Sequence, residues 1–203
     1  MSGLDAVKRW LDRSRALGFL GPGPVEQHLD HALAHSRAAR SAMPTAKAIC
    51  DLGAGGGVPG LVLAALDSSS LTLLDSMQRR TQFLQEAISS LGFDHVSVVT
   101  DRAETFARRA EAQFELVVAR SFGRPSVTAE VGARMLALGG ALCVSSGPET
   151  KMSWRDPNLA SLGFAYEAEV VEDGATFVVV RKVAPTPPAY PRRVGLPAKR
   201  PLW

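Results

Sequence analysis

Short apolar runs alternate with amphipathic stretches along most of this chain. Runs rich in β-branched residues predict strands over 46–51, 71–75, 96–100, 115–120 and 141–145. Apolar residues at three- and four-residue spacing predict the intervening helices over 60–67, 77–91, 103–112 and 126–138. Strands that alternate with helices in this way pair in parallel through right-handed crossovers. The pattern therefore predicts a doubly wound α/β sheet.

The pattern changes after the fifth predicted strand. Residues 164–171 and 176–183 both have the character of strands, and Asp173-Gly174 between them is typical of a tight hairpin turn. The two strands of a hairpin pair antiparallel. We therefore expect a Rossmann-like sheet of seven strands, mostly parallel and ending in an antiparallel hairpin.

The two ends of the chain differ from this core. Two helical patterns, over 3–17 and 24–40, precede it, with a Gly/Pro-rich run between them. Prolines punctuate the last segment, which we expect to run extended over the surface. The apolar side chains that would hold this tail to the body are Tyr190, Leu196, Leu202 and Trp203. The predicted division is a helical segment 1–45, a domain 46–183 and a tail 184–203.

Composition favours a globular cytoplasmic protein. The hydrophobic fraction is 46%, which is typical of folded domains. No uninterrupted apolar run approaches the ~20 residues of a membrane span, and the first residues lack a signal-peptide core. Cys50 and Cys143 both lie in apolar, strand-like runs, so we expect buried thiols rather than disulfides.

The net charge of +3 conceals an uneven distribution. Residues 51–180 carry sixteen acidic and ten basic side chains, whereas residues 181–203 carry six basic side chains and no acidic one. A basic tail on an acidic body is either a solvated terminus or an arm that binds phosphate backbones. Proline spacing and the aromatic side chains favour the second interpretation. The candidate RNA phosphate contacts are Arg192, Arg193, Lys199 and Arg200.

A glycine-rich turn follows the first predicted strand. The spacing there is Asp51-x-Gly53-x-Gly55-x-Gly57, and a helix follows. The second predicted strand ends in another acid, Asp75. Glycines allow the backbone to approach a ligand, and an acid at the next strand end accepts hydrogen bonds from a ribose diol. Together these features predict a site for a nucleoside cofactor.

The spacing of the glycines distinguishes between cofactors. A dinucleotide site follows G-x-G-x-x-G, and Val58 stands where the third glycine would be. The run from Asp51 to Val58 resembles instead motif I of class I S-adenosylmethionine-dependent methyltransferases. That site holds a zwitterionic amino-acid tail and no phosphate. A dinucleotide-dependent enzyme and a glycine turn without a ligand remain the alternatives.

A more specific resemblance covers residues 24–203. Several runs carry it. They are Asp51–Ala64 with its Val-Pro-Gly extension, Leu73–Ser76 with Arg79, Arg80, Phe83 and Leu84, Asp101–Glu104, Phe114–Phe122, and the basic run Tyr190–Leu202. They resemble the RsmG, or glucose-inhibited-division protein B, family of bacterial small-subunit ribosomal RNA guanine-N7 methyltransferases. The resemblance implies a class I methyltransferase fold, with S-adenosylmethionine as cofactor and ribosomal RNA or the small ribosomal subunit as partner. The helical region before the core is shorter than is usual in that family, but its helix keeps His28.

The resemblance also assigns residues to the cofactor. Asp75 would bind the ribose hydroxyls, and Ala103 with Glu104 would flank the adenine. Arg120, which ends the fourth strand, would meet the cofactor carboxylate or a substrate phosphate and is the catalytic candidate. The implied cofactor-binding set is Asp51, Gly53, Gly55, Gly57, Val58, Asp75, Ala103, Glu104 and Arg120. The local sequence leaves other roles open for three of these residues. Asp75 and Glu104 could instead be acids that stabilise the start of a helix, and Arg120 could instead form a structural salt bridge.

Motifs of several other methyl-transfer reactions are missing from the sequence. It has no Asn/Asp-Pro-Pro-Tyr/Phe motif for an exocyclic amine and no Pro-Cys pair for attack on a pyrimidine. The resemblance implies N7 methylation of a guanine in 16S ribosomal RNA. N7 carries an available lone pair and needs no general base, so the missing motifs fit that reaction. The alternatives are a methyltransferase of another RNA or a small molecule, and a SAM- or RNA-binding protein without turnover.

His28, His31 and His35 share one face of the second predicted helix. Three imidazoles suggest a metal, but a single helix rarely completes a coordination shell, and no cysteine or acidic cluster joins them. We therefore expect no metal. His28 is expected to contact the substrate or the backbone, and we include it with the candidate RNA-binding residues.

Overall fold

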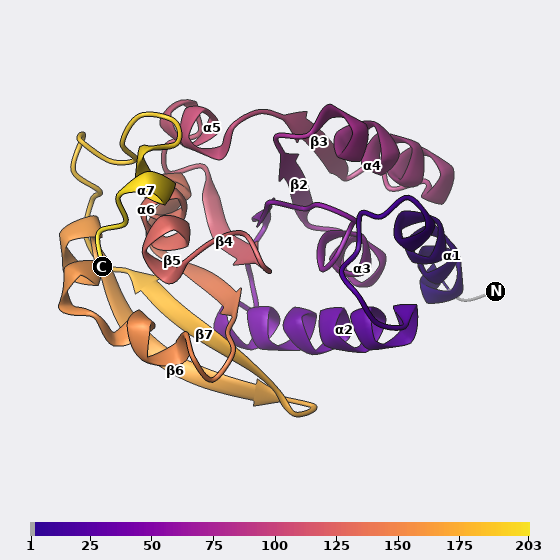
Figure 1. Ribbon diagram of the computed structural model, residues 1–203, viewed down its shortest axis with the longest axis horizontal. Helices are drawn as coiled ribbons and strands as arrows, with labels where there is room; N and C mark the ends of the chain where they lie inside the picture. The colour runs from indigo at the N-terminus through magenta and orange to yellow at the C-terminus, as the bar shows by residue number, and fades with distance from the viewer. Residues whose placement is uncertain (1–2) are drawn as a thin grey trace.

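The computed structural model describes residues 3–203, which form a seven-stranded sheet in the order β3-β2-β1-β4-β5-β7-β6 (Figure 1). The first five strands pair in parallel, and β7 pairs antiparallel with both β5 and β6. The fold class predicted from the sequence is therefore confirmed. The strands are β1 Ala48–Leu52, β2 Ser70–Asp75, β3 Val96–Thr100, β4 Phe114–Ala119, β5 Leu136–Ser145, β6 Phe164–Glu172 and β7 Ala175–Lys182.

All six expected helices are present close to their predicted bounds. They are α1 Gly3–Ala16, α2 Val25–Ala42, α3 Gly60–Leu66, α4 Gln78–Leu91, α5 Ala103–Arg109 and α6 Pro125–Met135. Three short helices were not expected, because one or two turns are too short to show a periodic pattern. They are η1 Lys151–Arg155, η2 Pro157–Leu162 and α7 Leu196–Lys199. Along residues 3–203, none of the helices combines the length and apolar character needed to cross a bilayer.

Helices cover both faces of the sheet, and the strand residues alternate between two cores. In β1, Ile49 belongs to the core formed with α1, α2, α3 and α4, whereas Cys50 and Leu52 belong to the core formed with α5 and α6. Successive side chains of a strand point to opposite faces, so this alternation requires cover on both sides. Cys50 and Cys143 are buried free thiols, as expected.

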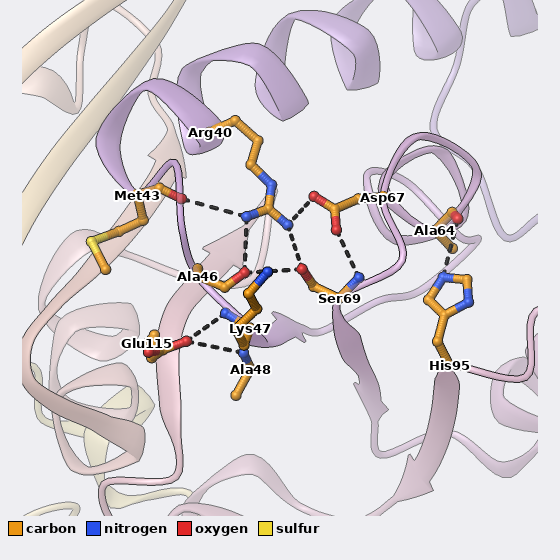
Figure 2. Close-up of polar contacts among 10 residues, drawn as sticks. All are labelled: Arg40, Met43, Ala46, Lys47, Ala48, Ala64, Asp67, Ser69, His95 and Glu115. Carbon is orange, nitrogen blue, oxygen red and sulfur yellow. Dashed lines mark hydrogen bonds and ion pairs between the residues drawn. The ribbon is translucent and has the colours of Figure 1, made fainter.

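Polar contacts tie helix α2 to the amino-terminal edge of the sheet (Figure 2). Near the end of α2, Arg40 donates to the Ala46 carbonyl and to Ser69 Oγ, both at 3.0 Å, and it pairs with Asp67. An α-helix rises ~1.5 Å per residue, so the 18 residues of α2 span ~27 Å. The opposite end of α2 carries His28 and reaches the carboxyl-terminal edge of the sheet. Helix α2 thus connects the two edges.

The C-terminal tail departs from the extended course expected for it. It contains the short helix α7, which lies beside α6 (Figure 1). Gly195, with a φ of +77°, precedes this helix, and Pro197 lies in its first turn, where the fixed φ of proline suits a helix. As expected, Tyr190, Leu202 and Trp203 pack against the core formed with α5 and α6.

Candidate active site

Asp51 lies at the end of β1 and is fully buried. Its Oδ2 accepts a hydrogen bond from the Gly60 amide at 2.9 Å, whereas Oδ1 has no partner among the described residues. A Cβ on Gly60 would lie 2.6 Å from Oδ2, so this approach requires glycine. Burial raises the pKa of Asp51 to about 7; the Gly60 hydrogen bond opposes this shift, Asp75 adds to it and Arg120 opposes it. Asp51 therefore holds the start of α3 from beneath the glycine turn and has one buried oxygen without a partner among the described residues.

The glycine turn after β1 folds back onto the end of β2. The amides of Gly53 and Ala54 both donate to the Leu74 carbonyl at 2.9 Å. Gly53 has a φ of +78°, and a Cβ on it would lie 2.7 Å from the Phe122 ring. Both the left-handed φ and the close approach favour glycine. The turn therefore presents backbone rather than side chains to the cavities beside it.

Asp75 ends β2 and is only 5% exposed. Its Oδ2 accepts the Gly55 amide at 2.9 Å, and its Oδ1 accepts the Met77 amide at 2.8 Å. Arg80 Nη1 lies 3.6 Å from Oδ2. The carboxylate thus orders both the glycine turn and the start of α4, which is the helix-start role left open by the sequence. It also lines a cavity, as a ligand-binding acid must.

This first cavity, of about 260 Å³, lies at the carboxyl ends of β2, β3 and β4. It brings together Asp75, Ala103 and Glu104, which were predicted as cofactor residues from distant parts of the sequence. Carboxyl ends of parallel strands meet at one edge of a sheet, which explains the convergence. Phe122 and Ala198 also line the cavity; both lie in runs that carried the family resemblance, but neither had been assigned to the site.

Glu104 connects the first cavity to the C-terminal tail. Its Oε1 accepts the Gly195 amide at 2.8 Å, and Arg102 Nη2 lies 3.7 Å from the same oxygen. Three residues further along the tail, Ala198 of α7 lines the cavity itself. The tail therefore forms part of the wall of the site.

A second cavity, also of about 260 Å³, adjoins the first and shares Gly53, Arg80 and Ser121 with it. Its predicted members are Gly53, Gly55, Val58, Arg120 and His28. Asp51 and Gly57 line neither of these two cavities and lie behind the turn.

The connection between α1 and α2 forms part of the wall of the second cavity. Phe19, Leu20 and Gly21 line it, although the sequence had marked this run only as a helix break. Ser14 Oγ donates to the Gly56 carbonyl at 2.8 Å, and a Cβ on Gly56 would lie 2.7 Å from Leu20. The N-terminal segment therefore packs directly on the glycine turn.

Arg120 follows β4 and lines the second cavity. Its Nη2 donates to Nδ1 of His28 at 2.8 Å, whereas Nη1 is buried without a partner among the described residues. Burial lowers the pKa of Arg120, and the nearby Asp51 carboxylate raises it. The site thus contains a cation and an acid that each have one unpartnered polar atom.

The four predicted phosphate contacts fall into two groups. Arg192 binds Glu130, a carboxylate with 0% exposure, through both Nε and Nη2. By contrast, Arg193, Lys199 and Arg200 are exposed, and within residues 3–203 their side chains have no partner. Arg192 therefore anchors the tail, while the other three cations are available to a ligand.

The other two histidines of α2 are engaged separately. His31 Nε2 lies 2.9 Å from Ser145 Oγ, and His35 Nε2 lies 3.1 Å from the Cys143 carbonyl. The ring of His35 stacks on Phe177 with centroids 4.8 Å apart. Burial lowers the pKa of His31 to about 4 and that of His35 to about 3. Both rings are therefore neutral core groups that hold α2 on the sheet.

Comparison with known proteins supports the resemblance read from the sequence. The family model described as rRNA small subunit methyltransferase G matches residues 12–162. Ribosomal RNA small subunit methyltransferase G of Thermotoga maritima is 36% identical over 162 residues, which cover 76% of this chain and 68% of that protein. The protein of the same name from Lactobacillus johnsonii is 34% identical over 167 residues, which cover 77% of this chain and 70% of that protein.

Solved structures with similar folds include a methyltransferase and a domain with SAH bound. One from Geobacter sulfurreducens has a TM-score of 0.66 at 12% identity and covers 87% of this chain and 90% of its own. The N-terminal domain of EvdMO1 with SAH bound has a TM-score of 0.56 at 19% identity, and the match covers 75% of this chain and 81% of that one. At such low identity these likenesses establish the fold alone. The sequence relatives go further: this chain is an enzyme that belongs to the rRNA small subunit methyltransferase G family.

Proposed function

We propose that this enzyme transfers a methyl group from S-adenosylmethionine to N7 of a guanine in 16S ribosomal RNA. The relatives from Thermotoga maritima and Lactobacillus johnsonii are named for ribosomal RNA of the small subunit. The observation that carries the proposal is the unpartnered Nη1 of Arg120, a residue that lines the second cavity beside the glycine turn. A guanidinium of this kind suits the carboxylate of an amino-acid tail, whose ammonium would meet the backbone of the glycine turn.

The residues present fit the cofactor. We assign the ribose hydroxyls to Asp75, the adenine to Ala103 and Glu104, and the amino-acid end to the glycine turn and Arg120. The two adjoining cavities suit a ligand with a nucleoside at one end and an amino acid at the other. When bound, S-adenosylmethionine supplies a methyl group on a cationic sulfur, which is a reactive electrophile.

The chain itself then needs only to bind, orient and exclude water. N7 of guanine carries its own lone pair, so no side chain has to remove a proton before attack. Positioning of two reactants accounts for a large part of catalysis in such reactions. We assign Arg120 to the cofactor carboxylate rather than to a substrate phosphate, because its unpartnered Nη1 is buried. Phe122 of the first cavity and Phe19 and Leu20 of the second supply the apolar surface that would exclude water from a bound cofactor.

We assign RNA phosphate contacts to the unpaired cations of the tail, Arg193, Lys199 and Arg200. The adjoining Ala198 lines the first cavity, so these cations lie close to the place where the cofactor would bind. Arg124, at the start of α6, is also exposed and joins this proposed surface. The small ribosomal subunit or its RNA is the proposed partner, and the cytoplasm the proposed location.

Calorimetric titration of S-adenosylmethionine and of NAD into the protein tests the cofactor assignment. We expect the protein to bind S-adenosylmethionine and not NAD. Asp75→Ala and Asp75→Asn should bind S-adenosylmethionine at least about tenfold more weakly, because the hydrogen bonds between the ribose and a charged carboxylate are lost. Asp94→Ala removes an exposed acid and is the matched control.

Transfer of a labelled methyl group to small-subunit RNA, followed by mapping of the modified atom, tests the reaction. Label at guanine N7 supports the proposal, whereas transfer only to another RNA or a small molecule, or cofactor binding without transfer to any of them, overturns it.

A further inference from the structure

His28 makes two hydrogen bonds that together determine its protonation state. Ring atom Nδ1 lies 2.8 Å from Arg120 Nη2, and Nε2 lies 3.1 Å from the Gly21 carbonyl. A guanidinium has only donors, so Nδ1 must be the acceptor and cannot carry a proton. A carbonyl has only lone pairs, so Nε2 must carry the proton. His28 is therefore a neutral imidazole in the Nε2–H form.

The surroundings place His28 where it can hold Arg120. His28 belongs to the first turn of α2, whose far end is attached to the sheet through Arg40 (Figure 2). Arg120 lies beyond the end of β4, next to Ser121, which has a φ of +53°. A long side chain such as arginine loses considerable rotamer entropy when it is held in one conformation. A hydrogen-bond partner on a rigid helix holds it there before the ligand binds, so the ligand does not have to order it.

The chemical nature of the partner has a consequence for ligand binding. A carboxylate on Arg120 would neutralise the guanidinium and compete with an incoming carboxylate. An imidazole nitrogen accepts one hydrogen bond without placing a negative charge on the guanidinium. One donor of Arg120 is therefore held by His28, while the buried Nη1 keeps both its charge and its bonding capacity for a ligand.

We propose that His28 is a positioning residue that holds Arg120 ready for the carboxylate of the cofactor. This rests on the proposed function, and it replaces the expectation that His28 contacts RNA. His28 is only 7% exposed, and both its ring nitrogens are engaged within the protein.

Substitutions that separate the two ring nitrogens test this role. In His28→Asn the amide oxygen takes the place of Nδ1 and preserves the acceptor for Arg120. In His28→Gln the amide nitrogen reaches the place of Nε2 and preserves only the donor to Gly21. We expect S-adenosylmethionine to bind His28→Asn within about threefold of wild type, and His28→Gln and His28→Ala at least about tenfold more weakly.

A carboxylate at the same position provides an independent test. His28→Asp keeps an acceptor for Arg120 but adds a negative charge, so we expect it to bind S-adenosylmethionine more weakly than His28→Asn. In an Arg120→Ala background, His28→Ala is expected to cause no further loss, because its effect passes through Arg120. Thermal unfolding of each variant, measured alongside, shows which proteins remain folded.

Several outcomes would overturn the positioning role. Equal losses in His28→Asn and His28→Gln, or additive losses of His28→Ala and Arg120→Ala, would indicate a general packing role. If wild type and His28→Ala bind S-adenosylmethionine equally, the positioning role fails while the proposed function stands. If folded wild type does not bind S-adenosylmethionine, both fail.

Discussion

Glu130 of α6, with no exposed surface, accepts four hydrogen bonds from Arg192 of the C-terminal tail, at 2.6–3.1 Å. One of them comes from the Arg192 amide, and the other three come from the guanidinium. The two residues are 62 positions apart in the sequence. This pair attaches the tail to the body and holds the following segment, with α7, beside the first cavity.

Arg192→Ala should destabilise the fold. It leaves the Glu130 carboxylate buried without its cation, and breaking a buried pair costs about 3–5 kcal/mol of unfolding free energy. Arg193→Ala is the control, since Arg193 is exposed, and it should change stability by less than about 0.5 kcal/mol. Urea unfolding of both variants measures the difference. Equal stability of the two variants would contradict the anchoring role of Arg192.

Lys199→Ala should weaken RNA binding through salt-dependent electrostatics. Each phosphate contact contributes a slope of about 0.7–0.9 to the dependence of log affinity on log salt, so losing one contact should reduce the slope by that amount. Lys47→Ala removes an equally exposed lysine at the amino edge of the sheet (Figure 2) and should leave the slope unchanged. RNA binding measured over a salt series gives the result. Identical slopes for the two variants would remove Lys199 from the proposed surface.

Gly60→Ala should destabilise the first turn of α3. Its Cβ would lie 2.4 Å from Leu73 and 2.6 Å from Asp51 Oδ2, and overpacking of this kind costs about 1–3 kcal/mol. A Cβ on Gly147 meets no atom within 4 Å, so Gly147→Ala is the matched control. Thermal unfolding compares the two. An unaffected Gly60→Ala protein would show that Asp51 does not need this close approach.

Asp51 should make the stability of the free protein fall as pH rises. Its pKa is about 7 in the folded chain against an ordinary 3.8, so between these values the folded state binds more protons than the unfolded state. Stability is therefore lost as pH rises from about 4 to about 7, and the loss is complete above pH 7. Asp51→Asn does not titrate and should lack this component.

Unfolding free energies of wild type and Asp51→Asn at pH about 5 and about 8 check this expectation. His31 and His35 have lowered pKa values in the folded protein, so their contribution to stability is lost as pH falls. Both proteins contain these histidines, so this contribution cancels when the two are compared. If the difference in unfolding free energy between wild type and Asp51→Asn is the same at both pH values, Asp51 does not have a raised pKa.

The sheet could be predicted because its signals are local. The apolar run that ends at Asp51 and the run that ends at Asp75 are each contiguous, and the alternation of strands and helices leaves few topologies open. The glycine spacing between them is equally local and correctly indicated the methyltransferase family. The tail, in contrast, lacks periodicity, and nothing in its own residues predicted α7.

The sequence by itself determined the α/β class, the family, and the strand ends that line the candidate site. Only the tertiary structure decided that Arg192 binds Glu130, that Glu104 accepts the Gly195 amide, and that His28 holds Arg120. The members of these pairs are 62, 91 and 92 residues apart. Hydrophobic periodicity reports the burial of each residue, but a polar side chain finds its partner only after the crossovers have brought distant segments together.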